Sequence, residues 1–166
     1  AMLYGVATDD AHDYHQFARR ERNPGRGWIM VRAPALEADA LMRAMERGDF
    51  YASTGVNLSS LRRTGRQLSL EIRGEPGISY TIQFIGTRRG YDTASVAMRD
   101  SAGAPVTRRY SDELGATLSE VRGVSATYAM RGDEIYVRAR VVSTKAKANP
   151  SYDGEVEMAW TQPVQP

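Results

Sequence analysis

Beyond residue 56 the chain alternates apolar and polar residues with a period of two, which is the pattern of β-strands that bury one face. The pattern is clearest over residues 135–141, where every second side chain is apolar. Shorter alternating runs lie at 68–72, 80–84, 96–98, 124–128 and 156–160, and turn signals rich in Gly, Pro and Asp separate them. Six or seven short strands with regular turns predict an antiparallel, β-sandwich-like C-terminal domain over residues 56–166.

The phase of the alternation also predicts which side chains form the core. One set is expected to point inward: Ile135, Val137, Ala139, Val141, Leu68, Leu70, Ile72, Ile82 and Phe84. The opposite face of the 135–141 strand presents Tyr136, Arg138 and Arg140. These three are interpreted as ordinary cross-strand neighbours, with a binding stripe as the alternative. The two tryptophans, Trp28 and Trp160, are interpreted as core anchors.

The first 55 residues follow a different order: a strand at 3–7, a polar loop, a strand at 28–31, a helix, and a strand at 50–53. The helix is expected over residues 37–47, and its apolar stripe consists of Ala38, Leu41, Met42 and Met45. Strands that alternate with a helix indicate an α/β unit. One such unit cannot close a sheet, so residues 1–55 are expected to form an incomplete segment ahead of the β-domain.

The charge balance and the composition exclude several classes of function. Lys and Arg number 22 against 20 Asp and Glu, and this net charge of +2 is too even for a nucleic-acid-binding face. The chain has no cysteine, which excludes disulfides, thiolate metal sites and cysteine nucleophiles. No apolar run approaches the ~20 residues that span a bilayer. We therefore expect neither a nucleic acid nor a membrane as a partner.

Candidate chemistry is concentrated after the first expected strand, where acidic residues and histidines follow one another over residues 8–15. Asp10 and His12 are two residues apart, so an extended strand end would place both on one face. Carboxylate oxygen and imidazole nitrogen together suit Zn, Mn or Fe. A solvated loop is the alternative, and two histidines are too few for a multi-histidine centre. His15 and the arginines over residues 19–26 are interpreted as solvent-exposed.

Residues 5–12, Gly-Val-Ala-Thr-Asp-Asp-Ala-His, resemble the last metal-binding motif of the PHP (polymerase and histidinol phosphatase) superfamily of metal-dependent phosphoesterases, where a strand ends in Asp-Ala-His. The runs 27–33 and 48–55 are similar to the end of that catalytic domain in one subgroup. Residues 134–139 and 159–163 more loosely resemble the C-terminal tails of the same subgroup. The resemblance is therefore strong over residues 3–55 and looser beyond them.

The resemblance implies a distorted barrel of seven βα units that holds up to three divalent metals at its strand ends. Asp10 and His12 match the aspartate and histidine of the final motif, which implies that both are metal ligands. Asp9 is a candidate for a supporting role behind these ligands. Ser53 and Thr54 follow a strand and are candidates for lining a phosphate pocket, with a plain strand-end turn as the alternative. The superfamily's opening His-x-His motif and its middle Glu and His ligands have no counterpart here, so no catalytic set is complete.

The sequence thus leads us to expect the C-terminal part of a larger metal-dependent phosphoesterase, inactive alone, in which residues 1–55 are the tail end of the barrel. The implied cofactor is a divalent metal (Zn, Mn or Fe), bound weakly or not at all by this chain. The implied partners are the missing N-terminal part of the barrel and a phosphorylated small molecule. Unpaired edges in the 1–55 segment also favour a homodimer. The alternative function is a non-catalytic β-sandwich module for binding or for packing on a catalytic domain.

Overall fold

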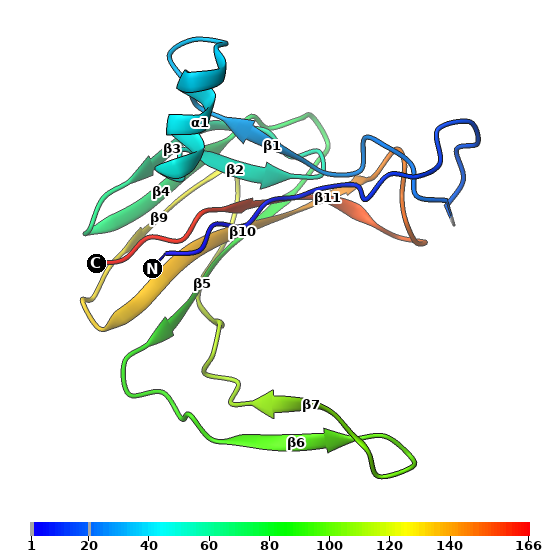
Figure 1. The fold of residues 1–166 in the computed structure, drawn as a ribbon. Coiled ribbons are helices and arrows are strands. Elements are labelled where there is room, and N and C mark those ends of the chain that lie inside the picture. Colours follow the sequence, from blue (N-terminus) through cyan, green and yellow to red (C-terminus); the bar gives the residue numbers. More distant parts are fainter. Residues whose placement is uncertain (1, 20) are drawn as a thin grey trace.

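The computed structural model describes residues 2–19 and 21–166, which fold into antiparallel β-sheets with a single helix (Figure 1). The largest sheet has six strands in the order β1 (Trp28–Val31), β2 (Phe50–Ser53), β11 (Val156–Thr161), β10 (Glu134–Ala146), β5 (Tyr80–Arg88) and β8 (Ala116–Arg122). A second sheet contains β3 (Leu58–Arg63), β4 (Gln67–Ile72) and β9 (Ser125–Ala129). The strands β6 (Ser95–Arg99) and β7 (Pro105–Tyr110) form a separate hairpin.

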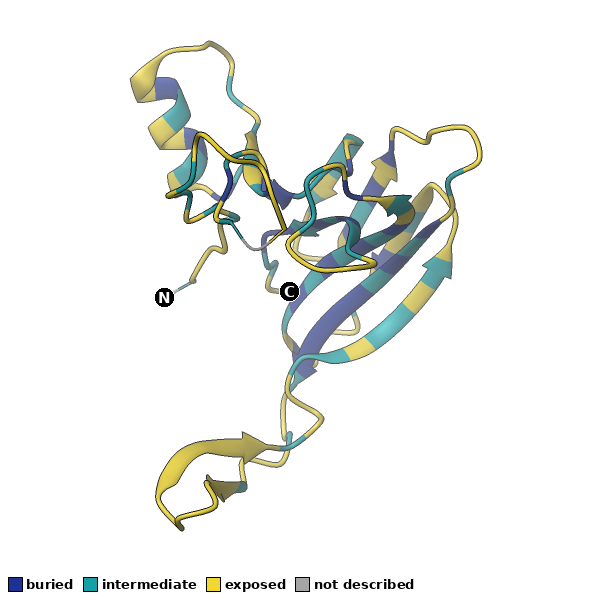
Figure 2. Ribbon diagram, turned by 90° about the vertical axis from the view of Figure 1, so that its right-hand side faces the viewer, coloured by how far each residue is buried: buried dark blue, intermediate teal, exposed yellow. Residues whose placement is uncertain are grey.

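The six-stranded and three-stranded sheets bury the core between them, and its buried strands are dark in Figure 2. The core prediction holds for the inward side chains of β4, β5 and β10, which are at most 5% exposed: Leu68, Leu70, Ile72, Ile82, Phe84, Val137, Ala139 and Val141. An antiparallel, β-sandwich-like domain is thereby confirmed. The period-two pattern identified this domain because each of these strands has one face in the core and one face outside it.

Ile135 is the exception to the predicted core, because its side chain is 36% exposed. The pairing of β10 with β5 is irregular at this point: Glu134 pairs with Arg88 and Tyr136 pairs with Thr87, so Ile135 has no partner in the register. Such a β-bulge changes which side chain faces inward, and here the carboxylate of Glu134 is fully buried. The predicted register is therefore wrong at residue 135 and right from Val137 onward.

Strand β5 continues through Gly86 to Arg88, beyond the alternating run at 80–84. A Cβ on Gly86 would lie 2.4 Å from the backbone oxygen of Tyr136, so this glycine serves a close approach between two strands. Three strands escaped prediction altogether: β3, β7 and β8. Their residues lack a clean alternation, and β7 is exposed along its whole length.

The expected strands at 28–31 and 50–53 are confirmed as β1 and β2. Strand β2 also pairs with β11, so the six-stranded sheet crosses the expected boundary between residues 55 and 56. The expected strand at 3–7 is wrong, because this segment forms no ladder. Instead the side-chain amide of Gln162 donates to the backbone oxygen of Gly5 (2.8 Å) and accepts from its N–H (2.9 Å). A side chain therefore takes the place of a neighbouring strand and holds the N-terminal segment beside β11 (Figure 1).

Helix α1 (Ala38–Glu46) confirms the expected helix and contacts β1. Its buried side chains are Ala40 and Ala44, whereas Met42 of the predicted apolar stripe is 57% exposed. The stripe prediction is wrong because the helix packs through its small residues. Among the described residues, no helix is both long and apolar enough to span a membrane.

The β6–β7 hairpin projects from the sandwich between β5 and β8, and Figure 2 shows it as an exposed arm. Its two strands pair with each other and with no other strand in the described part of the chain. Val96, Met98 and Val106 are exposed on it. An isolated two-stranded hairpin is marginally stable in water, so this arm is the least stable part of the β-structure.

Candidate functional site

The two predicted metal ligands lie side by side in the loop between the N-terminal segment and β1. The His12 Nδ1 atom lies 2.6 Å from the backbone oxygen of Asp10 and 3.9 Å from its Oδ1 atom. Both side chains are exposed, His12 to 59% and Asp10 to 81%. Asp10 adopts a positive φ of 49°, so a tight loop, and no extended strand end, brings the pair together.

The contact between His12 and Asp10 determines which imidazole nitrogen is available. A carbonyl oxygen only accepts hydrogen bonds, so Nδ1 carries the proton and donates to Asp10. In the neutral imidazole the lone pair then lies on Nε2, where a metal could bind, and a backbone carbonyl behind Nδ1 is a common support for a metal-binding histidine. Within residues 2–19 and 21–166, however, no group of three or more His, Cys, Asp or Glu side chains could surround one ion.

Asp9, the candidate supporting residue, closes the base of this loop. Its carboxylate accepts hydrogen bonds from the backbone N–H groups of Gly25, Arg26 and Gly27, at 2.7, 2.7 and 2.5 Å. Three charge-assisted bonds to consecutive amides fix the two ends of the loop against each other. Asp9 therefore supports the neighbouring Asp10 through the backbone.

Two buried residues hold the rest of the loop, and sequence reasoning missed both. The fully buried Asn23 donates to the backbone oxygens of Asp13 and Gln16 and accepts from the N–H of Ala18. Arg26 is only 9% exposed, so its interpretation as a solvated residue is wrong. Its guanidinium donates within the loop and also to Asn149 and Pro150, in the connection between β10 and β11. The turn signal Asn-Pro-Gly at residues 23–25 was the one sequence hint of a fixed corner.

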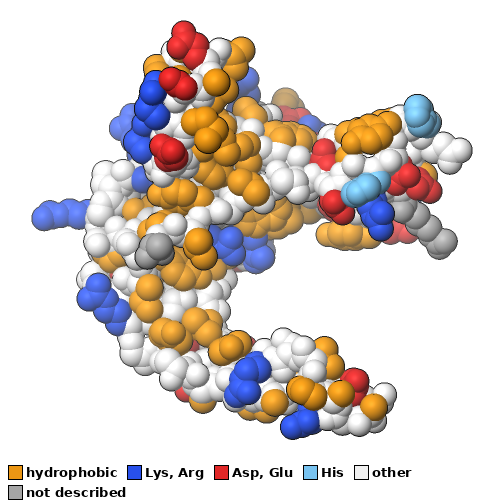
Figure 3. Space-filling view, in the orientation of Figure 1, with side chains coloured by type: hydrophobic (Ala, Val, Ile, Leu, Met, Phe, Trp, Pro, Cys, Tyr) orange, Lys and Arg blue, Asp and Glu red, His pale blue; other side chains and the backbone are white. Residues whose placement is uncertain are grey.

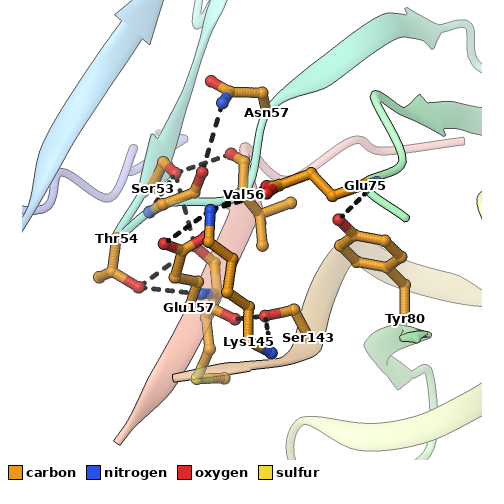
Figure 4. A network of polar contacts seen from close by, with 11 residues as sticks. Ser53, Thr54, Val56, Asn57, Glu75, Tyr80, Ser143, Lys145 and Glu157 are labelled. Atoms are coloured by element: carbon orange, nitrogen blue, oxygen red, sulfur yellow. Dashed lines mark hydrogen bonds and ion pairs between the residues drawn. The ribbon is translucent and has the colours of Figure 1, made fainter. Parts of the chain in front are cut away.

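Ser53 and Thr54 both lie at the end of β2, where their hydroxyl groups bind backbone atoms (Figure 4). The buried Ser53 Oγ donates to the oxygen of Val56 at 2.8 Å and accepts from the N–H of Gly55. Thr54 Oγ1 accepts from the N–H of Met158 on β11 at 2.9 Å. The Ser53 bonds fix the turn that follows β2, and the Thr54 bond joins this turn to β11. Of the two residues only Thr54 borders a cleft.

Next to them, Gly55 lies against the buried carboxylate of Glu157, which belongs to an ion pair. Gly55 has a φ of 151°, and a Cβ there would lie 2.1 Å from the carboxyl carbon of Glu157. Glu157 is buried and pairs with Lys145 (3.4 Å), which also pairs with Glu75 (2.9 Å; Figure 4). The hydrogen bond to Glu75 raises the pKa of Lys145. The ion pairs of Lys145 with Glu157 and Glu75 therefore require a residue without a side chain at position 55.

Gly55→Ala is expected to destabilise the protein by about 2–3 kcal/mol, since the new methyl group displaces Glu157 from its ion pair and strains the backbone. Gly77→Ala is the matched control: Gly77 also has a positive φ, of 76°, but a Cβ there meets nothing within 4 Å. Gly77→Ala should destabilise the protein only through backbone strain, by about 1 kcal/mol. Urea unfolding of both variants measures the difference in their free energies of unfolding. Equal losses of stability would contradict the expected collision between the new methyl group and Glu157.

A cleft of about 1070 Å³ lies on the outer face of the six-stranded sheet beneath the N-terminal segment. Asp9 and Asp10 border it on one side. Its remaining walls include Thr54, which follows β2, and residues of β2, β10 and β11: Ala52, Ile135, Tyr136, Arg138, Trp160 and Thr161. The cleft therefore connects a candidate metal ligand with the outer face of β10. Trp160 belongs to this cleft and Trp28 is 36% exposed, so the interpretation of both as core anchors is wrong.

Most of the charged groups around the cleft already have partners. Lys147 pairs with Glu155 at 2.9 Å, and Arg19 pairs with Asp153. Arg138 is half-buried, and its guanidinium has no hydrogen-bond or ion-pair partner among the described residues. The exposed guanidinium of Arg22, in the loop, also borders the cleft without such a partner among the described residues. Arg138 is therefore the unneutralised cation on the sheet face, and Arg22 is the one in the loop.

Comparisons of this chain with protein family models, with curated proteins and with solved structures give no match. Its function is therefore inferred from the residues of the chain and their geometry.

Proposed function

We propose that this chain is the C-terminal part of a metal-dependent phosphoesterase of the PHP type, in which Asp10 and His12 bind a divalent metal together with ligands from the part of the barrel that this chain lacks. The observation that carries the proposal is the adjacent, exposed pair in a fixed loop, with the lone pair of the neutral His12 imidazole on Nε2. A loop closed by Asp9, Asn23 and Arg26 keeps this geometry without a metal.

The donor set fits a borderline metal such as Zn²⁺, Mn²⁺ or Fe²⁺, since it combines an imidazole nitrogen with a carboxylate. When bound, such metals lower the pKa of a water molecule and polarise the oxygens of a phosphate ester. Two ligands do not fix a metal with catalytic geometry. The chain alone is therefore proposed to be inactive as a hydrolase.

Exposed apolar side chains favour a covering partner for residues 2–55. Leu3 is 86% exposed, Phe17 65% and Leu36 93%, and Figure 3 shows hydrophobic side chains spread over the helix and the surface below it. Exposed apolar patches of this kind mark interaction surfaces. The proposed partner is the preceding part of the barrel, and in its absence a second copy of the chain.

The alternative function, a non-catalytic β-sandwich module, is favoured by one observation. Among the described residues, the hydrophobic core begins at Tyr51 and uses no side chain from residues 2–19 or 21–27. The β-sandwich therefore has the core of an independent unit. The coding sequence upstream of Met2 separates the two functions, because a His-x-His motif there supports the phosphoesterase.

Metal binding tests the proposed ligands directly. Calorimetry of the chain with Zn²⁺ or Mn²⁺ is expected to show weak binding that His12→Ala reduces tenfold or more. His15→Ala is the matched control, since His15 is an exposed histidine of the same loop and should leave binding unchanged. Tight stoichiometric binding that survives His12→Ala would contradict the proposed role of His12.

A further inference from the structure

The outer face of the six-stranded sheet combines aromatic rings with an unneutralised guanidinium inside the cleft. Tyr136 and Arg138 are two residues apart on β10, and Trp160 lies on the adjacent strand β11. All three border the cleft, and none of them belongs to the hydrophobic core. Burial in the core therefore does not explain why these large side chains are here.

The position of Arg138 makes it suited to bind an anion. It lies inside a 13-residue strand that is paired on both sides, so its backbone is fixed. Its neighbour Arg140, by contrast, donates to the Oε1 atom of Gln83 at 2.8 Å and does not border the cleft. A half-buried guanidinium without a partner gains most from a carboxylate or phosphate, which it binds through two parallel hydrogen bonds.

Trp160 supplies the second half of a recognition site. It is half-buried and lies opposite Arg140 in the register of β10 and β11, so Arg138, two residues along β10, is its diagonal neighbour on the same face. Flat apolar groups pack on an indole ring with a gain beyond the area buried. A cleft of about 1070 Å³ is at the large end of small-molecule sites, so it accommodates a ligand well beyond one ring.

We propose that this cleft binds an organic anion, with a planar apolar group packed on Trp160 and a phosphate or carboxylate group on Arg138. The inference deepens the proposed function, on which its assignment as a substrate site rests: Asp10 borders the same cleft, so the bound molecule would be the phosphate ester presented to the metal. Binding itself requires no metal and uses only residues of this chain.

Tryptophan fluorescence tests the cleft without any activity measurement. The chain has two tryptophans, so Trp28→Phe leaves Trp160 as the only reporter. In the presence of a metal chelator, phenyl phosphate and benzoate are each expected to change the emission of Trp160 in a saturable manner. Phenol lacks the anion and inorganic phosphate lacks the ring, so each should bind at least tenfold more weakly. Preference between phenyl phosphate and benzoate shows which anion the site takes.

Arg138→Gln in the same background is expected to weaken the binding of phenyl phosphate at least tenfold and to leave that of phenol unchanged. Arg140→Gln is the matched control, since it removes the same charge from the same strand outside the cleft, and it should bind as the parent does. Equal losses of affinity in Arg138→Gln and Arg140→Gln would mean that only the net charge matters, and would overturn the proposal. The absence of any fluorescence response to phenyl phosphate and benzoate would also overturn it. Because a chelator is present, these outcomes are independent of whether His12 binds metal.

Discussion

Val137→Asp is expected to unfold the protein. Val137 is fully buried in the middle of β10, which lies between β5 and β11. A carboxylate at this position has no partner in the surrounding core of Leu, Ile and Phe side chains. Burying it costs more than about 4 kcal/mol, which is most of the stability of an ordinary domain. Loss of the far-ultraviolet circular dichroism signal of the sheet at 25 °C measures this outcome.

Arg138→Gln is the control for this prediction, because residue 138 is the next position on the same strand and faces the opposite side. Its free energy of unfolding is expected to stay within about 0.5 kcal/mol of the parent. Equal tolerance of both substitutions would mean that β10 has the opposite register to the one described here, since a shift of one residue exchanges its two faces.

Glu134→Gln is expected to destabilise the protein by about 3 kcal/mol at pH 7. The fully buried carboxylate accepts hydrogen bonds from Tyr128 (2.7 Å) and from the N–H groups of Arg131 (3.0 Å) and Gly132 (2.9 Å). Arg88 lies 3.6 Å away and balances the charge. A glutamine would turn an NH₂ group toward some of these donors, which leaves them unsatisfied.

The same carboxylate predicts how stability depends on pH. Burial alone would raise the pKa of Glu134, but the hydrogen bonds from Tyr128, Arg131 and Gly132 outweigh it and lower the pKa from 4.5 to about 2. The folded state therefore binds this proton less readily than the unfolded state. Its contribution to stability, on the order of 3 kcal/mol, is complete above pH 4.5 and is lost as the pH falls toward 2.

Urea unfolding between pH 7 and pH 2 checks both statements. The difference in unfolding free energy between the parent and Glu134→Gln should shrink as the pH falls from 4.5 to 2, because only the parent loses the contribution of the ionised carboxylate. Glu46→Gln, an exposed position on α1, should follow the parent throughout. A difference that stays constant with pH would contradict the low pKa of Glu134.

The fold was predictable where one face of a strand lies in the core and the other face lies outside it. Leu68, Ile82 and Val137 fall on the expected side because their strands alternate cleanly. Strand β7 is exposed on both faces, so its sequence contains no such signal. Ile135 was misplaced because a β-bulge depends on the partner strand, and a single strand's pattern does not encode the partner.

The candidate site was predictable only as a set of residue types. Asp10 and His12 were singled out from their spacing and from the resemblance, and their role as ligands stays a prediction. The residues that hold the site in place act over long distances in the sequence: Gln162 binds Gly5, and Arg26 binds Asn149. Local patterns do not report such pairs. Arg26 was therefore interpreted as solvent-exposed, and nothing in the sequence singled out Asn23 as a buried residue.

The place of β11 in the sheet has a consequence for how the chain acquires its structure during synthesis. β11 lies between β2 and β10, although all the other strands precede it in the chain. The β1–β2 pair and the β10–β5–β8 group therefore leave the ribosome as two separate halves, and each exposes an unpaired edge until β11 arrives. Pairings that wait for such distant residues form slowly and leave these edges open to other chains. Arg26 of the loop and Gly5 of the N-terminal segment bind Asn149 and Gln162, so the loop takes its place beside the sheet only after these C-terminal residues are made.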